Sequence, residues 1–223
     1  LILFNRREHT TGSDFTSYRE DWVGRVTYSY DRRYFLEFNG AYNGSEKFDR
    51  EYRFGFFPSV AAGWMLSNET FFESALPFFN IFKLRYSYGQ VGNDAGIARW
   101  QYVSVWNKRN HGKPFGHPFT QDRFDLYFEE KIANPDLHWE KKKKNNIALE
   151  SGIFNNLFTL NFDYFWEHRT DMFIAGSQRT NTVIFGGPLP SANLGEAKSW
   201  GWEMELGFSK AFSNSRIWSK LSW

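Results

Sequence analysis

The chain has 223 residues, a formal net charge of +2, no cysteine and an aromatic content of 21%. The small charge gives no support for nucleic-acid binding, and the lack of cysteine excludes a disulfide framework and a thiolate metal site. The mean hydropathy of −0.58 is low for so aromatic a chain. This combination favours a membrane β-barrel, in which a polar lumen and loops dilute an apolar outer band.

Alternating apolar and polar residues, separated by Gly, Asn, Asp and Pro, predict an antiparallel meander of about eight strands. Residues 1–8 fit the tail of a further strand. The predicted strands are 22–30, 34–42, 54–66, 81–91, 138–153, 158–167, 199–209 and 216–223.

The alternation is clearest in 199–209, where the odd positions include Glu203 and Glu205. Strand 158–167 alternates in the same way except at Phe165. Successive strand side chains point to opposite faces, so each strand has one polar and one apolar side. The apolar side of 199–209 consists of Trp200, Trp202, Met204, Leu206 and Phe208.

The connections between the predicted strands alternate in length. The tight connections are 31–33, 154–157 and 210–215, and the long ones are 43–53, 92–137 and 168–198. Only 67–80 breaks the rule, being long on the side of the tight turns. Outer-membrane barrels have short periplasmic turns and long extracellular loops, so the sorting predicts that topology.

Eight strands could close a small barrel whose interior is just filled by side chains. The predicted inward set would crowd that interior with charge, and an arc of a larger barrel is favoured because a wide lumen lets charges meet water or a second domain. The inward charges are Arg25, Glu37, Lys83, Arg85, Glu203 and Glu205.

A series of segments, in order, resembles the barrel of SusC/RagA-type TonB-linked outer-membrane proteins. FGFFPSVAAGWMLSNETFF at 54–72 precedes LPFFNIFKLRYSYGQVGND at 76–94, and YDRRYFLEFNGAYNGSEKF at 30–48 fits as well. Further along, NPDLHWEK at 134–141 opens a long strand, and NLGE at 193–196 leads into WGWEME at 200–205. The resemblance covers nearly the whole chain.

The resemblance implies a roughly 22-stranded barrel plugged by an N-terminal domain. It implies outer-membrane import of nutrients such as glycans or peptides, driven by the TonB complex, with a SusD-like surface lipoprotein as partner. The plug domain and the TonB box are absent from residues 1–223, which begin without Met. We therefore expect this chain to be part of the barrel wall and its extracellular loops.

Aromatic residues of the predicted loop 92–137 are candidates for sugar or peptide binding, because ring faces stack on apolar ligand surfaces. A self-packed loop core is the favoured alternative. The candidates are Trp100, Tyr102, Trp106, Phe115 and Tyr127. Glu203 and Glu205 are predicted to face the lumen, where they either contact a cationic plug surface or are simply hydrated.

Other site chemistry has little support. His111 and His117 lack a third ligand at diagnostic spacing, so no metal and no cofactor is predicted. The run 141–144 of four lysines could attract lipopolysaccharide phosphates, although a solvated charge run is favoured. No nucleophile elbow, zinc-binding helix motif or phosphate-cradling loop is present, so we expect no enzyme.

Two rival interpretations stay open at this stage. A passive outer-membrane porin would share the barrel but lack the plug. A soluble, aromatic-rich β-sandwich that binds carbohydrate would share the alternation, because soluble antiparallel sheets also have one apolar face.

Overall fold

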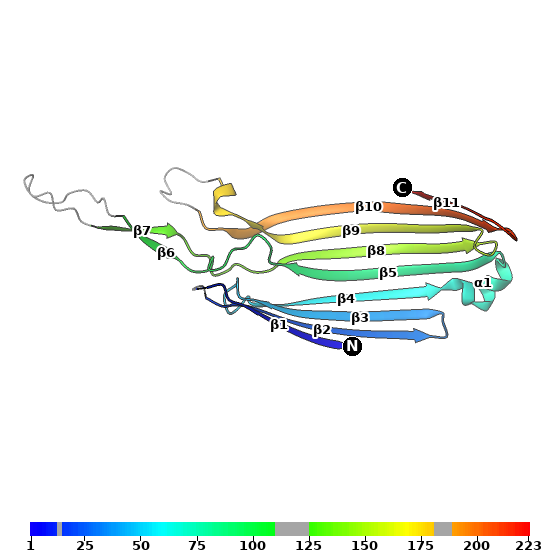
Figure 1. The fold of residues 1–223 in the computed structure, drawn as a ribbon, viewed down its shortest axis with the longest axis horizontal. Coiled ribbons are helices and arrows are strands. Elements are labelled where there is room, and N and C mark those ends of the chain that lie inside the picture. Colours follow the sequence, from blue (N-terminus) through cyan, green and yellow to red (C-terminus); the bar gives the residue numbers. More distant parts are fainter. Residues whose placement is uncertain (13–14, 110–124, 181–188) are drawn as a thin grey trace, which may run out of the picture.

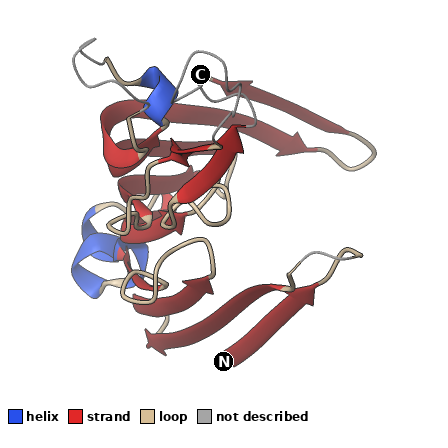
Figure 2. Cartoon of the chain, turned by 90° about the vertical axis from the view of Figure 1, so that its left-hand side faces the viewer, coloured by secondary structure: helices blue, strands red, loops and turns tan. Residues whose placement is uncertain are grey.

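The computed structural model describes residues 1–12, 15–109, 125–180 and 189–223. Nine antiparallel strands form one sheet in the order β1-β2-β3-β4-β5-β8-β9-β10-β11, and β6 and β7 form a separate two-stranded sheet. Figure 2 shows the large sheet curving into an open arc. The predicted all-β antiparallel meander is confirmed, and the described strands do not form a two-layer sandwich.

Every predicted strand is present, and the predicted tail at 1–8 is a full strand. The strands are Ile2–His9 (β1), Ser17–Tyr30 (β2), Tyr34–Ser45 (β3), Phe54–Met65 (β4), Phe79–Asn93 (β5), Val105–Arg109 (β6), Leu126–Lys131 (β7), Glu140–Ile153 (β8), Phe158–Ile174 (β9), Ala192–Ala211 (β10) and Arg216–Ser222 (β11). The helical segments are Leu66–Asn68 (η1), Thr70–Ala75 (α1) and Gly176–Gln178 (η2).

Two predicted loops are shorter than expected. The segment 92–137 contains the β6–β7 hairpin, and 168–198 loses residues to both β9 and β10. The pairing of β9 with β10 shifts register between Asn193 and Gly195 and again between Gly195 and Ala197. A β-bulge inserts an extra residue and interrupts the two-residue period, which explains why alternation alone misses the upper part of β10.

The two ends of the sheet carry different connections. At one end lie the tight turns and α1, and at the other end the β6–β7 hairpin extends beyond the sheet (Figure 1). The turn between β2 and β3 holds Asp31 and Arg32 at φ of 48° and 51°, the left-handed backbone that tight hairpins need. The predicted exception at 67–80 is real, because η1 and α1 occupy it.

The sheet has one aromatic face and one polar face. Trp202 pairs with Tyr164 and, one step on, Glu203 pairs with Asp163, so like side chains stand together across β9 and β10. Phe165, which breaks the alternation in sequence, lies on the polar face, where its ring approaches Gly201 so closely that a Cβ there would be 2.8 Å from it. The Phe165 ring thus packs over the backbone of Gly201, which has no side chain.

The ladder between β4 and β5 is incomplete. It runs from Ser59 opposite Gly89 to Met65 opposite Lys83, although β4 already begins at Phe54. The ladder ends next to Pro58, which has no backbone N–H to donate. The upper part of β4 therefore needs other contacts.

A buried cluster supplies those contacts at the long-loop end. Its members come from the β3–β4 connection, from β4 and from both ends of the long segment between β5 and β8: Phe48, Phe57, Ile97, Leu137 and Trp139. The rings of Phe57 and Trp139 lie 5.4 Å apart. The Phe57 ring also packs directly on Gly92, where any Cβ would collide with it. We call this set the seam cluster.

Replacing Trp139 by Ala should destabilise the barrel by about 3–5 kcal/mol, because it empties a site that is only 3% exposed in the folded chain. The measurement is the urea dependence of heat-modifiable gel mobility for the complete gene product in lipid.

Trp106→Ala is the matched control, since Trp106 is 64% exposed on the β6–β7 hairpin. Equal urea midpoints for the two variants would contradict a stabilising role for the seam cluster.

Candidate functional site

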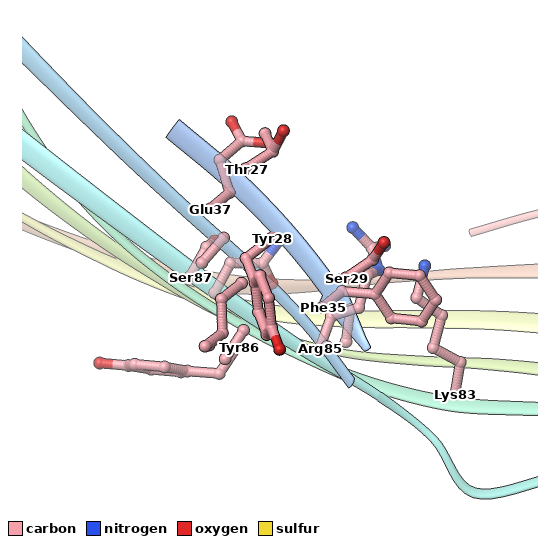
Figure 3. A pocket seen from close by; sticks show the side chains of 15 residues that line it. Thr27, Tyr28, Ser29, Phe35, Glu37, Lys83, Arg85, Tyr86 and Ser87 are labelled. Carbon is pink, nitrogen blue, oxygen red and sulfur yellow. The ribbon is translucent and has the colours of Figure 1, made fainter. Parts of the chain in front are cut away.

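The polar face of the sheet carries a hollow that spans β2, β3, β4 and β5. Figure 3 shows side chains that line it, with Thr27 and Glu37 lying together and Ser29 lying near Phe35 and Arg85. The cavity measures about 390 Å³, and its lining includes the small residues Ala61, Gly63 and Ala148, which leave this part of the wall open.

Ion pairs cross this face from strand to strand. The Arg85 Nε lies 2.6 Å from an oxygen of Glu150, and its Nη2 lies 3.7 Å from Asp163, so one guanidinium joins β5 to β8 and β9. On the N-terminal side, Arg25 and Glu37 are 2.7 Å apart. The expected inward charges thus stand on one face, but most are neutralised within the wall.

Glu203 and Glu205 lie beside this network. Both line a cavity of about 620 Å³ together with Arg85, Glu150 and Asp163. The Lys220 ammonium is 2.7 Å from Glu205. Glu203, in contrast, has no ion-pair partner among the residues that the structure describes. The polar wall therefore presents a carboxylate that is free to meet a cation from outside the chain.

The lysine run divides between the two faces of β8. Lys142 and Lys144 both reach Glu167, at 2.6 and 3.4 Å. Lys141 lies 3.5 Å from Asp171. Three of the four charges are thus compensated by carboxylates, which agrees with a structural charge run, and Lys143 is the member without an ion pair in the described ranges.

Placing Arg on the aromatic face should cost far more than placing it on the polar face. For Leu206→Arg we expect a destabilisation of up to about 2–4 kcal/mol, the cost at the bilayer midplane, because the guanidinium would enter hydrocarbon. Glu203→Arg should have a much smaller effect, since this residue lies among the carboxylates of Glu150 and Asp163. The free energy of unfolding in lipid vesicles is measured for both variants. Equal losses of stability would contradict the assignment of the aromatic face to lipid and the polar face to the lumen.

The structure separates the predicted aromatic candidates into two groups. Trp100 and Tyr102 lie together, with ring centroids 6.2 Å apart, and Trp100 also contacts Phe15 at 5.8 Å. Trp106 and Tyr127 stand on the β6–β7 hairpin and are 64% and 68% exposed. Phe115 lies outside the described residues, as do His111 and His117. In the described ranges no three residues form a group suited to a metal ion.

A rim network that sequence reasoning missed ties the long loops to the sheet. The Asn193 amide donates to the backbone carbonyls of His138 and Asp171, at 2.8 and 2.7 Å. Glu140 accepts from the backbone N–H of Phe173 at 2.8 Å, and Asn134 donates to the carbonyl of Ser191. The available signal was the pair of segments 134–141 and 193–196, whose polar residues prove to hold the rim together.

A second missed residue, Glu69, anchors the opposite end. It is 8% exposed and accepts hydrogen bonds from the Tyr34 hydroxyl at 2.7 Å, the Trp64 indole at 3.1 Å and Arg33 at 3.4 Å. The hydrogen bond from Tyr34, followed by that from Trp64, holds the pKa of the Glu69 carboxyl below its ordinary value. The ionised carboxylate thus fastens the β4–β5 connection to the start of β3.

Comparison with known families shows to which family the chain belongs. The model of the family described as "TonB dependent receptor-like, beta-barrel" matches residues 4–223. The chain belongs to this family. No helix in the described ranges is long and apolar enough to cross a membrane.

Relatives within TonB-dependent receptors place the chain near the SusC group. It is 27% identical over 214 residues to TonB-dependent receptor P26 of Formosa agariphila, covering 92% of this chain and 20% of the relative. It is 26% identical over 199 residues to TonB-dependent receptor SusC of Bacteroides thetaiotaomicron, covering 88% and 19%. The chain thus spans about a fifth of the length of these relatives.

Solved structures show the same fold. The RagAB peptide importer in its open-open state matches with a TM-score of 0.75 at 22% identity, covering 96% of this chain and 23% of that one. Its closed-closed state gives a TM-score of 0.73, covering 93% and 22%. The predicted resemblance to the SusC/RagA-type barrel is confirmed, and the soluble β-sandwich is excluded as the fold.

Proposed function

We propose that this chain is part of the wall of an outer-membrane importer that takes up nutrients with energy from the TonB complex. The observation that supports it is a single curved sheet of the TonB-dependent receptor family, aromatic on one face and lined with paired charges on the other. The apolar face suits lipid and the polar face suits a wet lumen. This is a transport role, and no enzymatic step is assigned to the chain.

The cargo that we propose is an oligomeric glycan or peptide, delivered through a SusD-like surface lipoprotein that docks on the long-loop end. The support is the kinship with SusC and the fold shared with the RagAB peptide importer. Trp106 and Tyr127, exposed on a hairpin beyond the sheet, are proposed cargo contacts together with Phe115. Trp100 packs against Phe15 and Tyr102 against Trp100, away from this hairpin.

The polar face is proposed to enclose a plug domain that the chain itself does not contain. The unpaired carboxylate of Glu203 and the neighbouring Glu205 suit a cationic surface on that domain. Coupling to the TonB complex would then pass through the plug, and the wall would supply a fixed, charged lining.

The topology predicts which end is exposed to the medium. Asn107→Cys lies on the β6–β7 hairpin and Asn155→Cys lies in the turn between β8 and β9. The natural chain contains no cysteine, so each variant has a single label site within this chain. A membrane-impermeant thiol reagent on intact cells should modify Asn107→Cys and spare Asn155→Cys. The reverse labelling would invert the proposed orientation.

Measuring the uptake of labelled oligomers distinguishes a TonB-dependent importer from a passive porin. Cells that contain the complete gene product should take up labelled oligomers, and deletion of TonB should reduce this uptake to the level of cells without the protein. A porin works by diffusion, so uptake that persists without TonB would overturn the proposal in favour of a passive channel.

A further inference from the structure

A cavity of about 580 Å³ lies at the long-loop end of the N-terminal strands. It is lined by four arginines but only two acidic residues, together with several aromatic rings. The residues that matter here are Arg6, Tyr18, Arg53, Arg99, Trp100 and Tyr102. The lining combines positive charge with flat apolar walls.

The register places Arg6, Tyr18 and Glu20 of the cavity on the aromatic face of the sheet, whereas Arg19 alternates onto the polar face and pairs with Asp21 and Asp94. Arg6 pairs with Glu20, and two positions away on the same face Phe4 pairs with Trp22. The rings of Phe4 and Trp22 lie 4.3 Å apart, and the Trp22 indole donates to Glu20 at 2.8 Å. The cavity begins where these rings end, since Tyr18 is four residues, or about 13 Å, beyond Trp22 along the strand.

Most of the cavity's charge is already committed to the fold. The Arg99 Nε lies 2.8 Å from Glu46, and its terminal nitrogens donate to the backbone carbonyls of Phe15 and Thr16. The same guanidinium lies over the Trp100 ring, 5.2 Å from its centroid. Arg99 therefore holds the segment with Trp100 and Tyr102 against one side of the cavity.

Arg53 is the exception. It is half-buried, it lines the cavity, and its Nε is a buried donor with no hydrogen-bond partner in the part of the chain that the structure describes. A buried guanidinium donor without an acceptor is costly, so an anion in the cavity would be bound favourably.

We propose that this cavity binds a phosphate group of the outer-leaflet lipid, namely the phosphorylated lipid A of lipopolysaccharide. Guanidinium groups match phosphate oxygens in geometry and charge, and aromatic rings suit the boundary between headgroup and acyl chains. The inference rests on the proposed outer-membrane location. It assigns the main lipid contact to Arg53 and a supporting one to Arg6, whose guanidinium lies 2.7 Å from the exposed carboxylate of Glu8. The lysine run is not part of this cavity, and three of its four charges are paired with Glu167 and Asp171.

A soluble acidic cargo is the less fitting occupant of this cavity. Cargo would pass along the polar face, whereas Arg6, Tyr18 and Glu20 alternate onto the face that carries Phe4 and Trp22. An acidic cargo is therefore treated as a contrary outcome of the test.

The test uses the complete gene product, purified in detergent and stripped of lipid. Binding of monophosphorylated lipid A is measured by native mass spectrometry and compared with binding of the same lipid A after phosphatase treatment. We expect Arg53→Gln to bind the phosphorylated form at least fivefold more weakly and Arg6→Gln to bind it more weakly than wild type. Phosphatase treatment should remove most of the difference between wild type and Arg53→Gln.

Lys143→Gln is the control, because Lys143 is an exposed cation on β8 outside the cavity, and its lipid A binding should equal that of wild type. Heat-modifiable gel mobility establishes that each variant is folded, and Arg6→Gln carries the test if Arg53→Gln is not. Unchanged binding in the folded arginine variants overturns the inference. So does a loss of acidic-oligosaccharide binding with lipid A binding intact.

Failure of this inference can be told apart from failure of the proposed function. Membrane fractionation and TonB-dependent uptake are measured on the same variants. A protein that imports cargo from the outer membrane but binds lipid A equally with and without Arg53 refutes only the lipid site. A protein that is absent from the outer membrane refutes both.

Discussion

Within the described ranges the sheet is a single layer, so both of its faces are uncovered, and this constraint governs the rest of the structure. Backbone groups must be paired along the ladders, because in the described part of the chain no second sheet or layer of helices covers either face of the nine-stranded sheet. Eight antiparallel interfaces join the nine strands, and the interface between β4 and β5 is the one that stops short, at Pro58. The seam cluster lies where that ladder ends, so hydrophobic packing takes over where hydrogen bonding fails.

The same alternation of residues gives the two faces of the sheet opposite chemistry. On the aromatic face the rings stand exposed, with Trp200 at 73%, as suits a surface whose solvent is lipid. On the polar face, cross-strand pairs such as Arg85 with Glu150 neutralise charge within the wall and fix side chains in place. The charges of the lining are therefore largely paired with one another, and Glu203 stands out as a carboxylate without an ion pair in the described ranges.

Much of the fold could be predicted from sequence because alternation is local. The apolar sides of 158–167 and 199–209 alone predict these strands. A register slip of one residue would move every apolar side chain to the polar face, so the alternation also fixes the register. The β6–β7 hairpin escaped prediction because its strands are short and do not alternate clearly, and the start of β10 escaped because of the bulge at Gly195. Glu69 and Asn193 gain their roles from partners far away in the chain, which no local pattern reveals. The candidate site residues remain predictions for the same reason.

The seam cluster also dictates an order of assembly. Phe48 lies in the β3–β4 connection and Phe57 in β4, but the Trp139 ring that packs against both follows a long excursion of the chain. Contacts between residues so distant in sequence form slowly, since the intervening loop must be closed first. The part of β4 that precedes Ser59 is therefore covered only once the chain has returned from this excursion to Leu137 and Trp139. Closing the seam is thus a long-range step, whereas the tight turns at the other end join residues that are neighbours in the chain.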